Sequence, residues 1–133
     1  MKYLLDTNVC IRYISRRAPH LLAKFAAIDE REFAVSIITK AELFYGSAKS
    51  QTPEISRAKQ EHFLNRFRTI TLDGKVVDHY ARIRAALEQR GTPIGGNDLF
   101  IAATALAHDL TLITHNTAEF DRVPDLKIED WEA

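Results

Sequence analysis

The residues best suited to chemistry in this sequence are acidic, and they lie where apolar segments begin or end. Asp6 closes the first apolar run, Glu42 follows the second, and Asp98 precedes an apolar helical segment. Glu119 and Asp121 follow the last apolar run. Hard divalent cations prefer carboxylate oxygens, and a set poor in histidine favours Mg²⁺ or Mn²⁺ over Zn²⁺. If these residues lie together, the sequence predicts a site for one or two such ions.

Each acid also has a purely structural interpretation. Asp6 is placed to cap a following helix, residues 39–42 match a capping box, and Asp98 beside Asn97 is placed to complement a helix dipole. A cap stabilises a helix by about 1 kcal/mol, whereas two carboxylates about 4 Å apart repel by about 4 kcal/mol at an effective dielectric near 20. Capping therefore explains single acids but not a cluster.

The elements that must position these acids are those of an α/β fold. Apolar runs without polar alternation predict buried strands of a parallel sheet, at residues 3–5, 33–38, 69–72 and 111–113. Helical periodicity predicts a helix from Pro53, with Thr52 as its N-cap, to about residue 68. It also predicts helices between Asp73 and Gly91 and over the almost wholly apolar segment 99–107. Alternating strands and helices predict a parallel sheet of four to five strands flanked by helices.

The geometry of such a sheet brings the acids together. The carboxyl ends of parallel strands share one edge, and the helices after them begin there, so Asp6, Glu42 and Glu119 are expected at that edge. Asp98 joins them only if residues 91–96, which span up to about 20 Å when extended, return the chain to the same edge.

Composition limits the remaining possibilities. The 133 residues, 46% hydrophobic and 27% charged, predict one globular domain over residues 1–133. Lys plus Arg and Asp plus Glu number 18 each, so any contact with nucleic acid must be local. The single cysteine, Cys10, lies in an apolar stretch, as expected for a buried thiol in a reducing cytoplasm. Neither a signal peptide nor a transmembrane run is apparent, so we expect no membrane association.

No glycine-rich phosphate loop, nucleophile elbow or zinc-ligand spacing is present, and the five histidines are scattered. A cation held by acids suits hydrolysis of phosphodiesters. Two alternatives remain open: a receiver-like phosphoacceptor domain, and a non-catalytic interaction module in which the acids are caps and the apolar helix is a docking surface.

Basic side chains that could contact RNA occur in several predicted helices, where a solvated helix face also accounts for them. They are Arg16, Arg17, Lys40, Lys49, Arg57, Lys59, Arg66 and Arg68. Phe33, Phe63 and Phe67 have the spacing of core residues rather than of an exposed base-stacking surface.

Four segments, which together span nearly the whole chain, resemble in order the conserved blocks of the PIN domain ribonucleases, and among them of the VapC toxins of toxin-antitoxin pairs. The segments are residues 5–11 (LDTNVCI), 41–46 (AELFYG), 93–98 (PIGGND) running into 101–103 (IAA), and 114–120 (THNTAEF).

This resemblance implies a PIN-like three-layer sandwich with a fifth strand near residues 126–128, and an endoribonuclease that depends on Mg²⁺ or Mn²⁺. It assigns Asp6, Glu42 and Asp98 to the metal site, with Glu119 as the fourth acid and Asp121 or Asn116 as alternatives. It further implies a homodimer, a VapB-type antitoxin whose arginine reaches the acids, and transfer RNA as substrate, with the anticodon loop of initiator tRNA as the best-known target.

Overall fold

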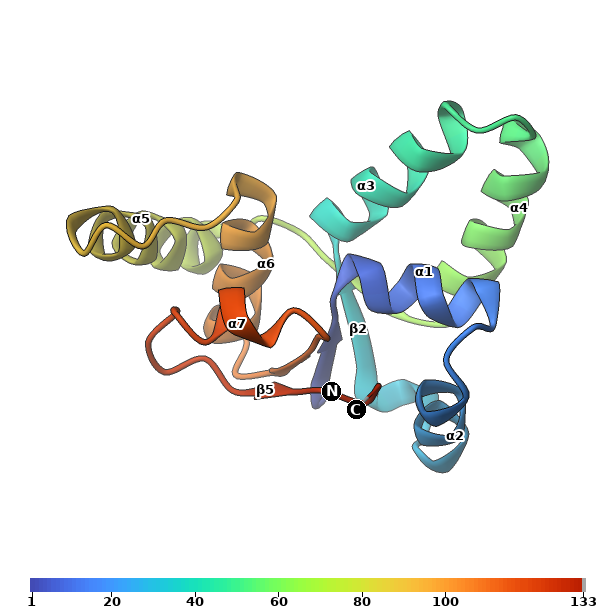
Figure 1. Ribbon diagram of the computed structural model, residues 1–133, viewed down its shortest axis with the longest axis horizontal. Coiled ribbons are helices and arrows are strands. Elements are labelled where there is room, and N and C mark those ends of the chain that lie inside the picture. The colour runs from blue at the N-terminus through green and yellow to red at the C-terminus, as the bar shows by residue number, and fades with distance from the viewer. Residues whose placement is uncertain (133) are drawn as a thin grey trace.

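The computed structural model describes residues 1–132, and its elements are an alternating series of strands and helices (Figure 1). The strands are β1 (Tyr3–Leu5), β2 (Phe33–Ser36), β3 (Arg68–Ile70), β4 (Thr111–Ile113) and β5 (Ile128–Glu129). The helices are α1 (Thr7–Ser15), α2 (Pro19–Ala27), α3 (Ile37–Ala48), α4 (Pro53–Leu64), α5 (Gly74–Gln89), α6 (Gly96–Ala107) and α7 (Thr117–Phe120), with a 3₁₀ turn, η1, at Glu30–Glu32.

The strands form one parallel sheet in the order β3-β2-β1-β4-β5. β2 and β3 extend the sheet to one side of β1, and β4 and β5 extend it to the other. In open sheets of this kind, a crevice forms at the carboxyl ends of the strands where the order reverses. Asp6 follows β1 directly and therefore lies at that crevice.

The side chains of the strands alternate between two apolar clusters, one on each face of the sheet. Leu4, Ala34 and Leu112 point into a cluster with residues of α5 and α6. Leu5 and Ile113 point into the opposite cluster, with residues of α1, α2, α3 and α4. Figure 1 shows α5 and α6 on one side of the strands and α1, α2 and α4 on the other. The predicted three-layer α/β sandwich is confirmed.

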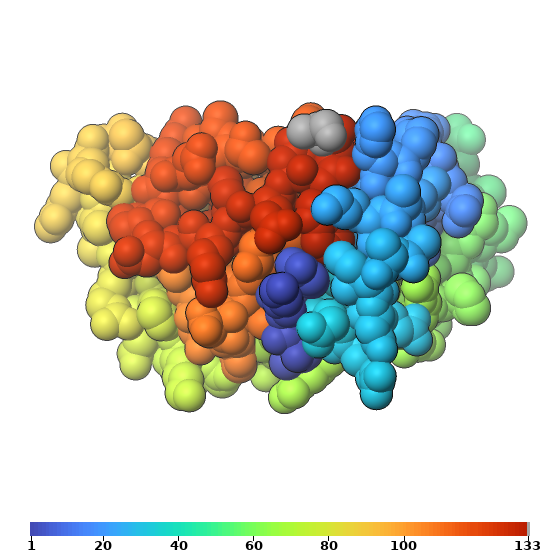
Figure 2. All heavy atoms as spheres, turned by 90° about the horizontal axis from the view of Figure 1, so that it is seen from below, coloured from blue at the N-terminus to red at the C-terminus, as the bar shows by residue number. Residues whose placement is uncertain are grey.

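The second cluster is rich in aromatic rings and includes the end of the chain. Phe33 stacks on Phe25 of α2 with 4.8 Å between ring centroids, and Trp131 packs edge-on against Tyr3 at 5.0 Å. Figure 2 shows the C-terminal segment in red lying against the α2 region in blue, next to the N-terminus. Phe33, Phe63 and Phe67 are 1%, 3% and 9% exposed, which confirms them as core.

Several predicted boundaries were wrong, and local hydrogen bonds explain why. The strand predicted to Ile38 ends at Ser36, because the Ser36 hydroxyl accepts a hydrogen bond from the Ile38 N–H at 3.1 Å and begins α3. The helix predicted to residue 68 ends at Leu64, where a tight turn begins; the Phe67 N–H donates to the Leu64 carbonyl at 3.0 Å.

The two edge strands, β3 and β5, also differ from the prediction. β3 covers Arg68–Ile70 rather than 69–72, since Leu72 is 37% exposed and lies outside the core. The fifth strand is Ile128–Glu129, slightly later than expected. Asp73 caps α5 as predicted, with its carboxylate accepting from the Val76 N–H at 3.0 Å.

α6 is the apolar helix of the sequence analysis, extended by one turn at its start. Leu99, Ile101, Ala102, Ala103, Thr104 and Ala105 are buried within the chain itself. The buried Thr104 hydroxyl donates to the Phe100 carbonyl at 2.7 Å, so this polar group is satisfied inside the helix. No helix of residues 1–132 is both long and apolar enough to span a membrane.

Candidate active site

Asp6 caps helix α1 and also lies at the carboxyl end of the central strand, β1. Its Oδ1 accepts a hydrogen bond from the Thr7 N–H at 2.8 Å, and its Oδ2 accepts from the Thr114 hydroxyl after β4 at 2.8 Å. The residue is only 4% exposed. Burial raises the pKa of Asp6 above its usual value, the Thr114 and Thr7 hydrogen bonds oppose this, and the nearby Glu42 and Glu119 add to it.

Glu42 reaches the same place from α3. The Thr7 hydroxyl donates to Glu42 Oε1 at 2.6 Å and also contacts the Thr39 hydroxyl at 3.0 Å. The Asn97 amide donates to Glu42 Oε2 at 3.4 Å. The predicted capping box at 39–42 is wrong, because α3 begins two residues before Thr39 and its cap is Ser36. Glu42 is therefore available for another role.

Asp98 and Glu119 lie at the same end of the sheet as Asp6 and Glu42. We call the place where these four acids meet the acidic edge. The backbone N–H of Gly95 donates to Glu119 Oε1 at 3.1 Å, and the Asn116 amide donates to Glu119 Oε2 at 2.6 Å. Asp98 Oδ2 and Glu119 Oε1 lie 3.8 and 3.9 Å from the position that a Cβ atom would take on Gly95. Residues 91–96 thus return the chain to the edge, as the placement of Asp98 requires.

The charge states of this pair differ sharply. Burial, followed by the negative charges of Glu119 and Asp6, raises the pKa of Asp98 to about 7. Burial also acts to raise the pKa of Glu119, but hydrogen bonds from Gly95, Asn116 and Asp98 outweigh it, so the Glu119 pKa is lowered. Near neutral pH, Asp98 is therefore partly protonated and Glu119 is ionised.

The structure brings four of the predicted acids to one edge of the sheet: Asp6, Glu42, Asp98 and Glu119. Asp121 is exposed at the C-terminal end of α7, and Asn116 serves as a hydrogen-bond donor to Glu119. In the described chain, none of the four acids forms an ion pair with a basic group within 4.0 Å.

This set of ligand groups fits a hard divalent cation, because four carboxyl groups lie near one another without an ion pair to a basic side chain among the described residues. Within residues 1–132, no three of the four acids each place an oxygen within 4.8 Å of the others. Such spacing suits an ion that keeps several water ligands, as Mg²⁺ commonly does.

The hydrogen-bonding residues around the acids were missed by sequence reasoning. Thr7, Thr114, Asn97 and Gly95 all donate to a carboxylate of the site. The available signal was adjacency, because Thr7 and Asn97 directly neighbour acids that had been singled out. Neutral hydroxyls and amides have no periodicity or charge that marks them as functional.

A second cluster of polar residues lies near the end of β5. His115, Asp130 and Glu132 each bring one possible ligand atom within 4.8 Å of the others. His115 Nδ1 and Asp130 Oδ2 are hydrogen-bonded at 2.9 Å, and Arg12 of α1 forms an ion pair with Glu132. The Arg12 guanidinium therefore compensates the negative charge of this cluster, whereas the acidic edge has no such ion pair among residues 1–132.

A hollow of about 520 Å³ adjoins the acidic edge. Glu42 and Thr7 lie at one part of its wall, and Ile11, Tyr45 and Lys49 at others. Tyr45 is 66% exposed, with the Lys49 ammonium 4.7 Å from its ring centroid. Glu42 is therefore open to a large ligand from this side.

Comparison with known proteins decides the family. The PIN domain family model matches residues 3–126. The chain belongs to the PIN domain family. Within this family, it is 38% identical to the tRNA(fMet)-specific endonuclease VapC of Salmonella typhimurium over 98% of both chains, and 41% identical to the ribonuclease VapC2 of Haemophilus influenzae over 98% of both.

Solved structures of VapC proteins have the same PIN fold. The chain superposes on the DNA-bound VapBC structure from Salmonella typhimurium with a TM-score of 0.93 and 39% identity, covering 98% of each chain. The promoter-bound VapBC2 structure from Rickettsia felis gives a TM-score of 0.92 at 38% identity, covering 98% of this chain and 99% of that one. These matches confirm the resemblance to the VapC branch of the PIN family.

Proposed function

We propose that this PIN domain is a metal-dependent endoribonuclease that hydrolyses RNA phosphodiester bonds at Asp6, Glu42, Asp98 and Glu119. The observation that carries the proposal is the convergence of these four carboxylates without a basic partner among the described residues. The ribonuclease and endonuclease names of VapC relatives about 40% identical over nearly the full chain support it.

Asp6, Glu42, Asp98 and Glu119 are the residues that would hold Mg²⁺ or Mn²⁺. When bound, such an ion lowers the pKa of a water, neutralises the non-bridging phosphate oxygens and stabilises the departing 3′ oxygen. Hydrolysis by in-line attack of water would leave a 5′ phosphate and a 3′ hydroxyl.

The chain's own residues prepare this site before substrate arrives. Thr7 fixes two acids at once, since its N–H donates to Asp6 and its hydroxyl to Glu42. Gly95 and Asn116 hold Glu119 in the ionised state. Asp98 is still partly protonated near neutral pH, and its proton must leave before the carboxylate can bind a cation, so cation affinity is expected to rise with pH.

The names of the relatives support a substrate and a partner for this chain. The relatives from Salmonella typhimurium and Shigella flexneri are named as tRNA(fMet)-specific, which supports transfer RNA, with the initiator anticodon loop as the favoured target. Solved VapBC complexes support a VapB-type antitoxin as the partner of this chain. We further propose a homodimer acting in the cytoplasm, where the buried thiol of Cys10 stays reduced.

The decisive experiment combines cleavage of total cellular RNA, with and without EDTA, and sequencing of the cut ends. Asp98→Asn is expected to lower the cleavage rate by about 100-fold or more, because it removes a cation ligand. Asp121→Asn is the matched control: it changes an exposed acid of the same region and should retain activity. Cleavage by Asp98→Asn at the wild-type rate would exclude this role for Asp98.

The two alternatives make different predictions. A receiver-like fold has the strand order 2-1-3-4-5, whereas this sheet has the order 3-2-1-4-5, so the topology argues against a receiver. A pure interaction module would show no EDTA-sensitive cleavage at all. The RNA experiment therefore separates it from a nuclease.

A further inference from the structure

A basic cavity lies at the far end of α1 from the acidic edge. Its volume is about 270 Å³. We call it the basic cavity, and its lining consists of Tyr13, Ile14, Arg16, Lys59, His62, Phe63 and Arg66. Four of these side chains are basic or can become so, and no acid is among them. In a chain whose net charge is zero, this is a local concentration of positive charge.

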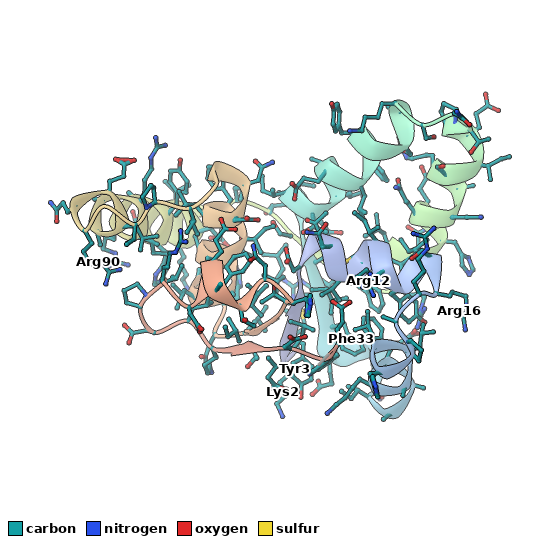
Figure 3. All side chains as sticks on the ribbon, in the orientation of Figure 1. Lys2, Tyr3, Arg12, Arg16, Phe33 and Arg90 are labelled. Atoms are coloured by element: carbon teal, nitrogen blue, oxygen red, sulfur yellow. The ribbon has the colours of Figure 1, made fainter. Side chains whose placement is uncertain are left out.

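Two helices, α1 and α4, and the residues that directly follow them build the basic cavity. Tyr13 and Ile14 come from α1, while Lys59, His62 and Phe63 come from α4. Arg16 ends α1 in the left-handed conformation, with φ of 57°, and Figure 3 shows it at that end of the helix, below the end of α4. The cations therefore approach one space from different elements rather than forming a single helix face.

Arg66 closes the wall of the cavity in a fixed position. Its guanidinium donates to the Tyr13 hydroxyl at 3.1 Å and to Glu30 Oε2 at 3.0 Å. The Tyr13 ring in turn lies 5.2 Å from the ring of Phe63, which is 3% exposed and provides an apolar floor. An apolar floor strengthens the attraction between an anion and the cations above it.

Two of the cations are not neutralised. Arg66 forms an ion pair with Glu30. Neither Arg16 nor Lys59 forms an ion pair within 4.0 Å in the part of the chain that the structure describes. Both residues line the cavity, and their positive charge there favours an anionic ligand. The volume, about nine times that of a liquid water molecule, accommodates a phosphodiester group with parts of its sugars.

The position of the cavity relates it to the acidic edge. Thr7, which lines the hollow beside the acids, is nine residues before Arg16, which corresponds to about 14 Å along a helix. A single RNA strand engaged at the acids can extend along α1 to this point. A second phosphate contact there would orient the strand without reading its sequence.

We propose that the basic cavity binds a backbone phosphate of the RNA substrate at a position away from the bond that is cut. This inference rests on the proposed nuclease function, and it adds a second anchor to that site. Arg16 and Lys59 are positioning residues in this view: they raise affinity and fix the direction of the strand, and they take no part in the cleavage step.

The test is RNA binding by the full chain carrying Asp98→Asn, so that binding is measured without cleavage. The probe is a fluorescein-labelled single-stranded RNA of about 12 nucleotides, followed by anisotropy at several salt concentrations. Adding Arg16→Glu and Lys59→Glu should weaken binding by about tenfold or more and flatten the salt dependence by about one released counterion per lost contact. Arg16→Lys with Lys59→Arg, which keeps both charges, should retain binding within about threefold.

Lys75→Glu with Arg82→Glu is the matched control, since it makes the same charge change at two exposed positions of α5 across the sheet. An equal loss of affinity in this control, or unchanged affinity and salt slope in the cavity variant, would overturn the proposal. Should the double variant fail to fold, Lys59→Gln alone must still reduce the salt slope. Normal RNA affinity with lost affinity for a synthetic acidic peptide would assign the cavity to a protein partner and also overturn the proposal.

Kinetics of cleavage, with Asp98 intact, separates this proposal from the nuclease proposal. The cavity variant should raise KM by about tenfold and leave kcat unchanged, because only binding is affected. If wild-type protein cuts RNA and the variant has a normal KM, the cavity proposal fails and the nuclease stands. If wild-type protein cuts no RNA but the binding defect is present, the nuclease proposal fails and the anion site stands.

Discussion

At the scale of single residues, the main feature of this molecule is that one side chain performs two tasks that sequence reasoning had treated as alternatives. Asp6 caps α1 through Thr7 and also belongs to the acidic edge through its second oxygen. The cap holds one oxygen in place, so the carboxylate has little freedom left to lose when a cation binds. Capping and catalysis are therefore compatible uses of the same group.

Thr114 is the residue whose replacement tests this arrangement. Its hydroxyl donates to Asp6 Oδ2 at 2.8 Å and opposes the rise in the Asp6 pKa that burial causes. Thr114→Val removes that donor, so the Asp6 pKa should rise further and the acidic limb of the rate profile should move to higher pH. The measurement is the initial rate of RNA cleavage as a function of pH.

Thr114→Ser is the control for that profile, because it keeps the hydroxyl and should leave the acidic limb near its wild-type position. If Thr114→Val and wild-type protein lose activity at the same pH, the hydrogen bond does not govern the ionisation of Asp6. A fall in rate that is equal at all pH values would point instead to a packing defect around the buried Thr114.

At the scale of elements, the start of α3 decides where Glu42 is placed. Ser36 is fully buried and its hydroxyl caps the helix, whereas Thr52 precedes α4 without a side-chain hydrogen bond to it. Ser36→Ala should therefore destabilise the fold by about 1 kcal/mol and lower Tm by about 3 to 5 °C, measured by calorimetry. Thr52→Ala, at the matching position of α4, should change Tm by less than about 1 °C. Equal shifts in the two variants would contradict the cap assignment.

The elements also show what could be predicted from the sequence and what could not. Apolar runs correctly indicated the strands, and the order of strands and helices correctly indicated the α/β class, because burial on both faces of a sheet demands such runs. Residues 37 and 38 were misread as strand, since isoleucine suits both states and only the Ser36 hydrogen bond selects the helix. The return of residues 91–96 to the acidic edge depends on the Gly95 contact with Glu119, which no local pattern encodes.

At the scale of the whole molecule, a net charge of zero hides two regions of opposite sign. The acidic edge has four carboxylates without a basic partner within the described residues, and the basic cavity has two cations in the same condition at the other end of α1. A cation would complement the first region, and an RNA phosphate the second. Such a separation would let a neutral protein bind a polyanion through local contacts rather than through a general field.

The crowding of carboxyl groups at the acidic edge should be visible in the stability of the whole fold. Asp98 has a pKa of about 7 in the folded protein against an ordinary value of 3.8. Its protonated form favours folding, so its contribution is fully present below its ordinary pKa and is lost as the pH rises through about 7. Asp98→Asn, which cannot ionise, should melt at the same temperature as wild type near about pH 4 but about 2 to 5 °C higher near about pH 8, with EDTA present.

Mg²⁺ should reverse this difference in Tm between Asp98→Asn and wild type, because a bound cation relieves the same repulsion between carboxylates that the substitution removes. Saturating Mg²⁺ is expected to raise the wild-type Tm more at about pH 8 than at about pH 5, where the Asp98 proton competes with the ion. Asp121→Asn keeps the acidic edge intact and should respond as wild type does. A magnesium response of equal size at both pH values, or one of wild-type size in Asp98→Asn, would mean that the ion binds elsewhere on the protein.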